Sequence, residues 1–247
     1  MGTHYNTDIV LCDGPMNIAA YAKSARFEAT CDELDTTPMG STDGYQTLIA
    51  GAKSGLVDVS LMAEHTNDGL DEVQWAQHGV LSIPKSFAIG SADGSVAYTM
   101  NGIALSYSPF GGEVGQLAMA SVKGRSASSP VVRGKVLHPI GTARSASGTG
   151  TGRQLGAVVA GKSVYAALHV ASATGTTPSL TVKVQSDDNG SFTTPTDRIT
   201  FTAETDATSH YQWGSAAGAI TDDYWRASWT ISGTGPSFTF LLAVGIV

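Results

Sequence analysis

The chain has 247 residues, of which 42% are hydrophobic and 14% are charged, and its formal net charge is −7. This length fits one large or two ordinary domains, and it is sufficient for a hydrophobic core without metals or disulfides. The absence of a Lys/Arg-rich run argues against nucleic-acid binding, and the low charged fraction, against a usual value of about 25%, indicates either subunits that cover one another or a Ser/Thr-rich surface.

Three further features narrow the class of protein. The part up to residue 140 has 8 Lys/Arg and 14 Asp/Glu, a net charge of −6, whereas the remainder has 6 and 7, a net charge of −1. Cys12 and Cys31 are too few for a disulfide framework and lack the spacing of a zinc site, so we expect both to be reduced and buried. No basic segment followed by an apolar one opens the chain, and no apolar run reaches about 18 residues, so we expect neither a secretion signal nor a membrane span.

Strand signals recur along the whole chain. Short alternating or β-branched runs are separated by clusters of Gly, Asn, Asp and Ser, which is typical of half-buried strands. The clearest runs are residues 55–62, 95–100, 131–137, 180–185 and 198–202. The predicted fold class is therefore mainly β.

One helix is predicted between residues 66 and 78. Residues 66–68 offer capping side chains, two acidic residues follow in the first turn, and His78-Gly79 ends the segment. The apolar residues that fall at helical spacing, and so predict the packed face, are Leu70, Val73 and Ala76.

A composition shift divides the chain. Residues 141–152 are small and polar without apolar periodicity, which is typical of a flexible linker. We therefore predict a first domain over residues 1–140 and a second over 153–247. In the second domain, strand runs and turns alternate at short intervals, a pattern that favours an Ig-like β-sandwich.

The clearest enzyme-like motif is Gly156 to Ser163, which fits the phosphate-loop pattern letter by letter. That loop needs a buried strand before it and a helix starting at its Lys, so that backbone amides surround a phosphate. Here a Gly/Thr/Ser stretch precedes the motif, and an alternating run begins at Ser163. The context favours a strand, a turn containing Gly161 and a second strand.

Other groups that could carry chemistry are also better explained as structure. The six His residues lack metal-ligand spacing, and His169 fits a hydrogen-bonded position on a sandwich strand. Residues 187–190 could bind calcium but lack the later Glu of an EF-hand, so a hairpin turn is favoured. The acids at 32, 33 and 35 lack aromatic neighbours that would hold a sugar. We expect no enzyme, no cofactor and no metal.

The residues around those acids carry a family resemblance. The run 33–41, followed by 48–51 and the strand 55–60, resembles the major tail-tube proteins of long-tailed, siphovirus-like bacteriophages. The resemblance implies an inter-ring stacking loop containing Leu34, Asp35, Thr36, Thr37, Pro38, Met39, Gly40, Ser41 and Tyr45. It also implies a tube-wall strand containing Gly55, Val57, Asp58, Val59 and Ser60. A further stretch, 180–232, is similar to β-sandwich modules that decorate phage virions.

The resemblance also implies an assembly. Subunits of this family form rings, commonly hexamers, which stack into a tube through which DNA is ejected. It implies contacts with a tape-measure protein and with tail-terminator or distal tail proteins, and a location in the virion tail after synthesis in the bacterial cytoplasm. DNA would pass without specific binding, and the acidity of the first domain predicts an acidic lumen that repels phosphates.

Two other functions stay open at this point. The terminal sandwich could be a receptor- or carbohydrate-binding adhesin, with Tyr224 and Arg226 on its exterior face. Strand alternation, however, places Trp225 and Trp229 on the opposite face, which predicts that they belong to the core. An enzyme is the third reading, and it would be detected by thermal protection with nucleotide.

Overall fold

The computed structural model describes residues 8–39, 44–67, 69–205 and 210–247. It confirms the mainly β fold class, with one α-helix among the described residues. The strands of the first part, in chain order, are β1 Ile9–Asp13, β2 Met16–Asn17, β3 Ala22–Asp35, β4 Leu48–Met62, β5 Ile83–Ile89, β6 Val96–Gly111, β7 Met119–Ser126 and β8 Val132–His138. The helix, α1 Leu70–Gln77, lies between β4 and β5. Because α1 has only 8 residues, the described chain has no helix that could cross a membrane.

The first part is built around a sheet in the order β3-β4-β7-β6, with all neighbours antiparallel. β6 is long enough to leave this sheet, so its first half pairs with β5 and β8 and its second half with β7. Apolar side chains from one face of the sheet pack against α1 and β1, and this core contains Leu11, Val57, Val59, Leu61, Leu70, Met100 and Val122.

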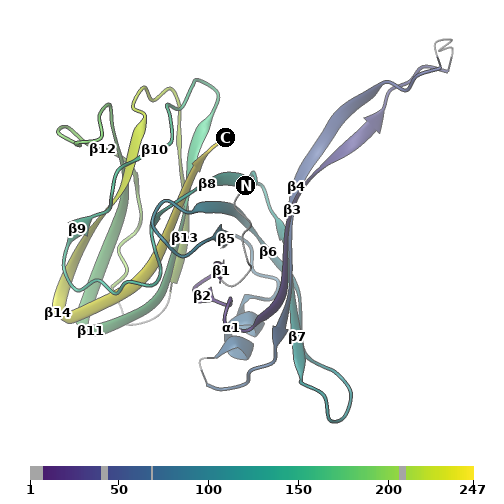
Figure 1. Cartoon of the computed structure of the whole chain (residues 1–247), viewed down its shortest axis with the longest axis horizontal. Coiled ribbons are helices and arrows are strands. Elements are labelled where there is room, and N and C mark those ends of the chain that lie inside the picture. The colour runs from purple at the N-terminus through teal and green to yellow at the C-terminus, as the bar shows by residue number, and fades with distance from the viewer. Residues whose placement is uncertain (1–7, 40–43, 68, 206–209) are drawn as a thin grey trace.

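The second part is a sandwich made largely by two long strands. They are β11 Ser163–Asp187 and β14 Tyr224–Ile246, which pair with each other along most of their lengths. Register shifts near Thr174 to Ser179 mark the place where both strands bend (Figure 1). The remaining strands are β9 Gly148–Thr149, β10 Arg153–Gln154, β12 Thr196–Thr200 and β13 His210–Ala217. Trp225 and Trp229 are buried in the sandwich core, as predicted.

The two parts share hydrogen bonds and a small core of their own. β8 pairs with the end of β14, so the strands connect into one 14-stranded sheet. Val10, Ala97, Val136 and Leu241 contribute to an apolar cluster at this junction. A buried Asp13–Lys85 ion pair lies beside it.

The predicted linker runs along β14. Arg144 forms a β-bridge with Phe238, its Nε donates to His138 Nε2 over 2.9 Å, and its guanidinium lies 5.0 Å from the Trp229 ring centre. Gly148 and Thr149 pair with β14 as β9. The stretch 141–152 is therefore held along its length by backbone and side-chain contacts.

Two local predictions were wrong. The buried face of α1 contains Leu70, Gln74 and Gln77, whereas Ala76 is exposed, because the Gln77 side chain packs against Gly14, which follows β1. Cys31 is exposed because β3 leaves the core and continues into a projecting hairpin, while Cys12 is buried as expected.

Candidate assembly surfaces

The predicted stacking loop forms the outer part of a long β3–β4 hairpin. Leu34 lies opposite Ile49, and Asp35 lies opposite Leu48. The Thr37 amide donates to Asp35 Oδ1 over 2.8 Å, and the Thr37 hydroxyl accepts from the Thr47 amide over 2.8 Å. The hydrogen bonds from Thr37 hold the pKa of the Asp35 carboxyl below its ordinary value. Cross-strand bonds therefore reach as far as Thr37 and Thr47, and Gly40 and Ser41 lie outside the described residues.

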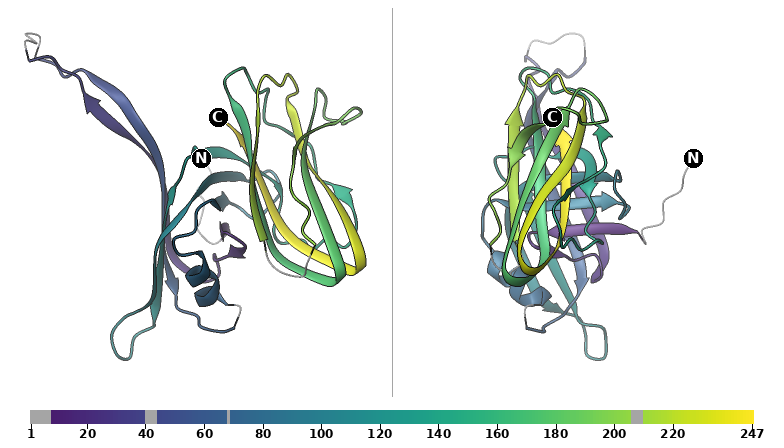
Figure 2. Two further views of the ribbon diagram at one scale, coloured as in Figure 1. Left: turned by 180° about the vertical axis from the view of Figure 1, so that it is seen from behind. Right: turned by 90° about the vertical axis from the view of Figure 1, so that its left-hand side faces the viewer.

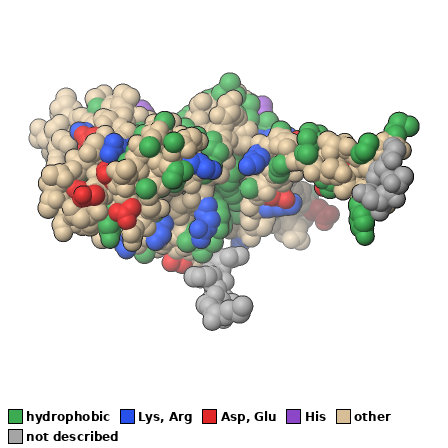
Figure 3. Space-filling view, turned by 90° about the horizontal axis from the view of Figure 1, so that it is seen from above, with side chains coloured by type: hydrophobic (Ala, Val, Ile, Leu, Met, Phe, Trp, Pro, Cys, Tyr) green, Lys and Arg blue, Asp and Glu red, His purple; other side chains and the backbone are tan. Residues whose placement is uncertain are grey.

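This hairpin projects away from the rest of the molecule and is rich in exposed apolar side chains (Figure 1). Leu34 is 50% exposed, Ile49 51% and Tyr45 78%, and Met39 is fully exposed. Figure 3 shows hydrophobic side chains along the projecting arm. An isolated two-stranded ribbon is marginally stable in water, and clustered exposed apolar residues mark interaction sites. The hairpin therefore has the character of a segment covered by a partner.

The predicted wall strand lies at the centre of the sheet, where β4 pairs with both β3 and β7. Val57 and Val59 are buried, so the alternating Asp58 and Ser60 lie on the opposite face. Gly55 is required by close packing, because a Cβ there would lie 2.5 Å from Val131 Cγ2 and 2.8 Å from Met100 Sδ.

The opposite face of the sheet carries two polar rows across all four strands. Directly opposed residues share a face, and the register places four serines in one row: Ser24, Ser60, Ser121 and Ser108. The next row contains Arg26, Asp58, Lys123 and Ser106, with an ion pair of 3.3 Å between Lys123 and Asp58. Glu28 and Arg125 follow in the third row, so these three rows together contain three basic and two acidic side chains and are not acidic.

Both lateral edges of this sheet are open among the described residues. β3 pairs only with β4, which leaves one edge of a 14-residue strand without a partner. From Leu105 to Gly111, β6 pairs only with β7, and no described strand covers its other edge. Open edges with unpaired backbone groups are templates for pairing with another chain.

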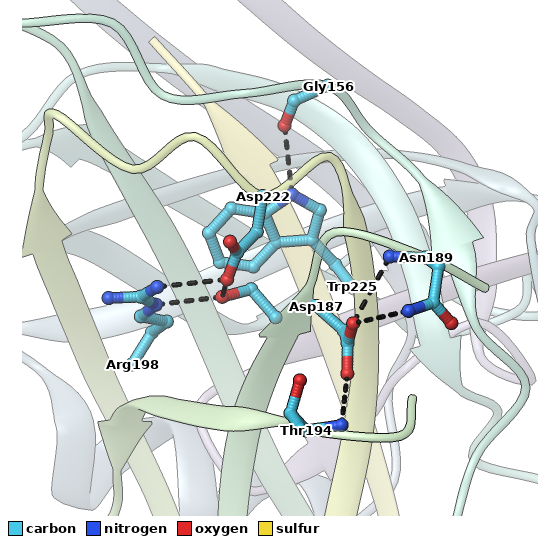
Figure 4. Close-up of polar contacts among 8 residues, drawn as sticks. Gly156, Asp187, Asn189, Thr194, Arg198, Asp222 and Trp225 are labelled. Atoms are coloured by element: carbon cyan, nitrogen blue, oxygen red, sulfur yellow. Dashed lines mark hydrogen bonds and ion pairs between the residues drawn. The ribbon is translucent and has the colours of Figure 1, made fainter. Parts of the chain in front are cut away.

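In the second part, several polar side chains of the described loops form hydrogen bonds or ion pairs within the chain (Figure 4). The Asp187 carboxylate accepts from the Asn189 amides over 3.1 Å and from the Thr194 amide over 2.9 Å. Arg198 pairs with Asp222 over 2.9 Å, and Trp225 Nε1 donates to the Gly156 carbonyl over 2.9 Å. The predicted turn at residues 187–190 is confirmed, because the carboxylate is used by its own loop.

The other predicted residues of the second part lie as follows. Arg226 is half-buried, with its Nε donating to Gln185 over 3.0 Å and its guanidinium 4.4 Å from the Phe192 ring centre. Tyr224 is half-buried beside Gly190. A ligand-binding role for Tyr224 and Arg226 stays a prediction. Gly161 has a φ of +80° in a turn, and Ser163 starts a strand, so the phosphate-loop motif has no helix after it.

His169 is hydrogen-bonded on β11, as predicted, but its partners belong to the first part. Nδ1 lies 2.6 Å from the Gly14 carbonyl and must donate to it, so Nε2 accepts from the Ser86 hydroxyl over 2.7 Å. Burial lowers the pKa of His169 to about 4, which keeps the ring neutral. Ser86 is fully buried, so this pair holds the junction and is inaccessible to a substrate. Within the described residues, no cluster of three metal-ligating side chains occurs.

Comparison with known proteins finds similarity only among solved structures. No protein-family profile matches the chain, and no curated protein does. A chain from the virion of a native gene transfer agent particle is 15% identical with a TM-score of 0.40, over 52% of this chain and 98% of that one. The anti-feeding prophage tube-terminating cap is 10% identical with a TM-score of 0.41, over 53% and 91%. The SPP1 Dit protein, a paradigm of the hub adsorption apparatus in phages that infect Gram-positive bacteria, is 10% identical with a TM-score of 0.38, over 97% of this chain and 99% of that one.

Proposed function

We propose that this chain is a structural subunit of a phage tail tube, which assembles into rings, commonly hexamers in the family it resembles, and that the rings stack into a conduit for DNA. The single observation that carries the proposal is a sheet with two open edges and a projecting apolar hairpin. Each feature needs a partner, and a second copy of the chain offers partners for all of them. Contacts between different patches of identical chains are heterologous, and they generate closed rings when the rotation closes.

In the proposed ring, neighbouring copies would pair through the open edges of the sheet. In the order β3-β4-β7-β6 the strands alternate in direction, so the β6 of one copy would meet the β3 of the next as an antiparallel neighbour. Pairing these edges would satisfy unpaired backbone groups on both copies. The four-stranded sheets would then join into one continuous barrel.

In the proposed tube, the β3–β4 hairpin would form the contacts between stacked rings. It leaves the sheet at one end, whereas the β6–β7 loop, with exposed Val114 and Leu117, lies at the other, where Met62 pairs with Met119 (Figure 2). Residues 34–45 would therefore reach a neighbouring ring. The tape-measure and tail-terminator or distal tail proteins are further partners under this proposal.

In the proposed tube, the polar rows would line the lumen. The sandwich lies on the core side of the sheet in both Figure 1 and Figure 2, so the face with Ser60 and Asp58 would face inward and residues 153–247 outward. The expected acidic lumen is replaced in this proposal by a charge-paired, hydroxyl-lined one, because the acids at 32, 33 and 35 lie on the hairpin. Paired cations would hold phosphates weakly. The division into a wall domain of residues 1–140 and an outer domain belongs to the same proposal.

The test is electron microscopy of the purified protein. Negative-stain images are expected to contain rings or tubes of uniform diameter. Deletion of residues 35–45 is expected to leave a folded protein that cannot form tubes, because the stacking contacts are lost while the core of the sheet remains. Circular dichroism and thermal unfolding check the fold of the variant. Tubes that persist unchanged in the deletion variant would contradict the assignment.

A further inference from the structure

An aromatic groove lies beside the open edge of β3. It has a volume of about 330 Å³ and is lined by Ala25, Arg26, Phe27, Phe87 and Tyr98. The Phe27 and Tyr98 rings are 6.2 Å apart and tilted by 41°, and both side chains are half-buried. A smaller adjoining hollow shares Ala25 and Phe87. The groove is thus an aromatic hollow that the chain's own side chains do not fill.

An apolar projection lies beside the open edge of β6. Trp75, near the end of α1, is 68% exposed, and Leu81 is 64% exposed. Trp75 stacks on His78 with the ring centres 6.5 Å apart. The Gly79 amide donates to the Ala104 carbonyl over 2.9 Å, which fixes this segment to the β6 edge. Exposed Trp and Leu side chains held in place on a surface are typical of interface anchors.

The groove and the projection lie on the same face of the sheet. Phe27 and Ala25 are directly opposite the buried Val57 and Val59, which places them on the core face. Helix α1 lies on that face too, since Tyr107, which pairs with buried Val122, donates from its hydroxyl to Asp71 over 2.9 Å. Strand pairing between copies would therefore bring α1 of one copy to the groove side of the next.

The groove and the projection also lie at the same position along the strand direction. One row of directly opposed residues runs from Arg26 on β3 to Ser106 on β6, so the part of β3 beside the groove and the part of β6 beside α1 are in line across the sheet. The charges agree with this approach as well, because exposed Lys23 lines the adjoining hollow and α1 has acidic residues in its first turn. Complementary charges at the rim favour the correct partner and register.

We infer that the groove of Phe27, Phe87 and Tyr98 receives Trp75 of a neighbouring copy, so that ring closure depends on a side-chain anchor in addition to strand pairing. The occupant is a second copy of this chain, and the inference rests on the function proposed above. Burying Trp75 would remove a large exposed apolar surface, and it would make the lateral contact specific for one register.

The first test is Trp75→Ala, with Val159→Ala as the matched control because Val159 is also exposed (61%) but lies in a turn of the second part. Trp75→Ala is expected to stay folded and to raise the protein concentration needed for ring formation by at least about tenfold. Val159→Ala is expected to assemble like the wild type. Sedimentation velocity and negative-stain images measure this. Assembly of Trp75→Ala at the wild-type concentration would overturn the inference while leaving the proposed function intact.

The second test is cross-linking of Ala25→Cys with Trp75→Cys in a Cys31→Ser background, where the remaining Cys12 is buried. Mild oxidation is expected to give a ladder of covalent oligomers, whereas each single-cysteine variant gives none. Wild-type rings without a ladder in the double variant would overturn the anchor alone. A wild-type protein that forms neither rings nor oligomers at any concentration would overturn both the anchor and the tube.

Discussion

The two parts of the molecule differ in how many of their strand edges, loop side chains and apolar side chains have partners within the chain. In the second part, β11 and β14 pair over most of their lengths, and the loop carboxylates are used by neighbouring amides and an Arg. In the first part, the sheet ends in two open edges, and the hairpin exposes Leu34, Ile49 and Tyr45. Among the described residues, the second part pairs its two longest strands with each other and uses its loop carboxylates internally, whereas the first part combines open sheet edges with an exposed apolar hairpin.

The largest expected effect tests the packing of the second part. Trp225 is fully buried and its Nε1 donates to Gly156, so Trp225→Ala is expected to lower the free energy of unfolding by about 3 to 5 kcal/mol. Trp75→Ala, at an exposed site of the first part, is expected to change it by less than about 0.5 kcal/mol in the monomer. Urea unfolding measures both. Similar losses in the two variants would remove the contrast between the parts.

The next effect tests the junction between the parts. Burial lowers the pKa of His169 from 6.5 to about 4, and burial also lowers that of His138 to about 4. Below about pH 6.5 the unfolded chain takes up protons that the folded chain does not bind. Stability is therefore expected to be fully present above pH 6.5 and to fall as the pH drops toward 4, by on the order of 3 kcal/mol for His169.

The measurement is denaturant unfolding at pH 7 and pH 4.5. His169→Asn is expected to reduce the difference in stability between the two pH values, because the neutral amide does not titrate. The control, His78→Asn, changes an exposed His on the first part and is expected to keep the wild-type difference. A His169→Asn variant with the full wild-type pH dependence would contradict the junction's role.

The smallest effect tests the packing of β4 at Gly55. Gly55→Ala is expected to destabilise the protein by about 1 to 3 kcal/mol, because the new Cβ would lie within 3 Å of Val131 and Met100. Gly141→Ala places a Cβ in open space, and it is expected to change stability by less than about 0.5 kcal/mol. Thermal unfolding compares the two. Equal stabilities of the two variants would contradict the close packing around Gly55.

Periodicity predicted which segments are strands, but not how far they extend. The run at 55–62 is the inner half of β4, whose outer half from Leu48 has no alternating burial. That outer half is a strand because β3 pairs with it as far as Asp35. For the same reason, composition suggested a free linker at 141–152, whereas hydrogen bonds from β14 hold it in place. Pairing partners distant in sequence are not visible in local patterns.

The sequence by itself determined the mainly β class, the positions of α1 and the turns, and the burial of Trp225 and Trp229, because these depend on local conformational preference and strand alternation. Only the tertiary structure decided which strand edges are open and which side chains come together on the surface. The open edges, the four-serine row and the groove beside Phe27 arise from strand order and register, which bring together residues up to about a hundred positions apart. Register is set by packing of whole faces, and so it appears only when the sheet is assembled.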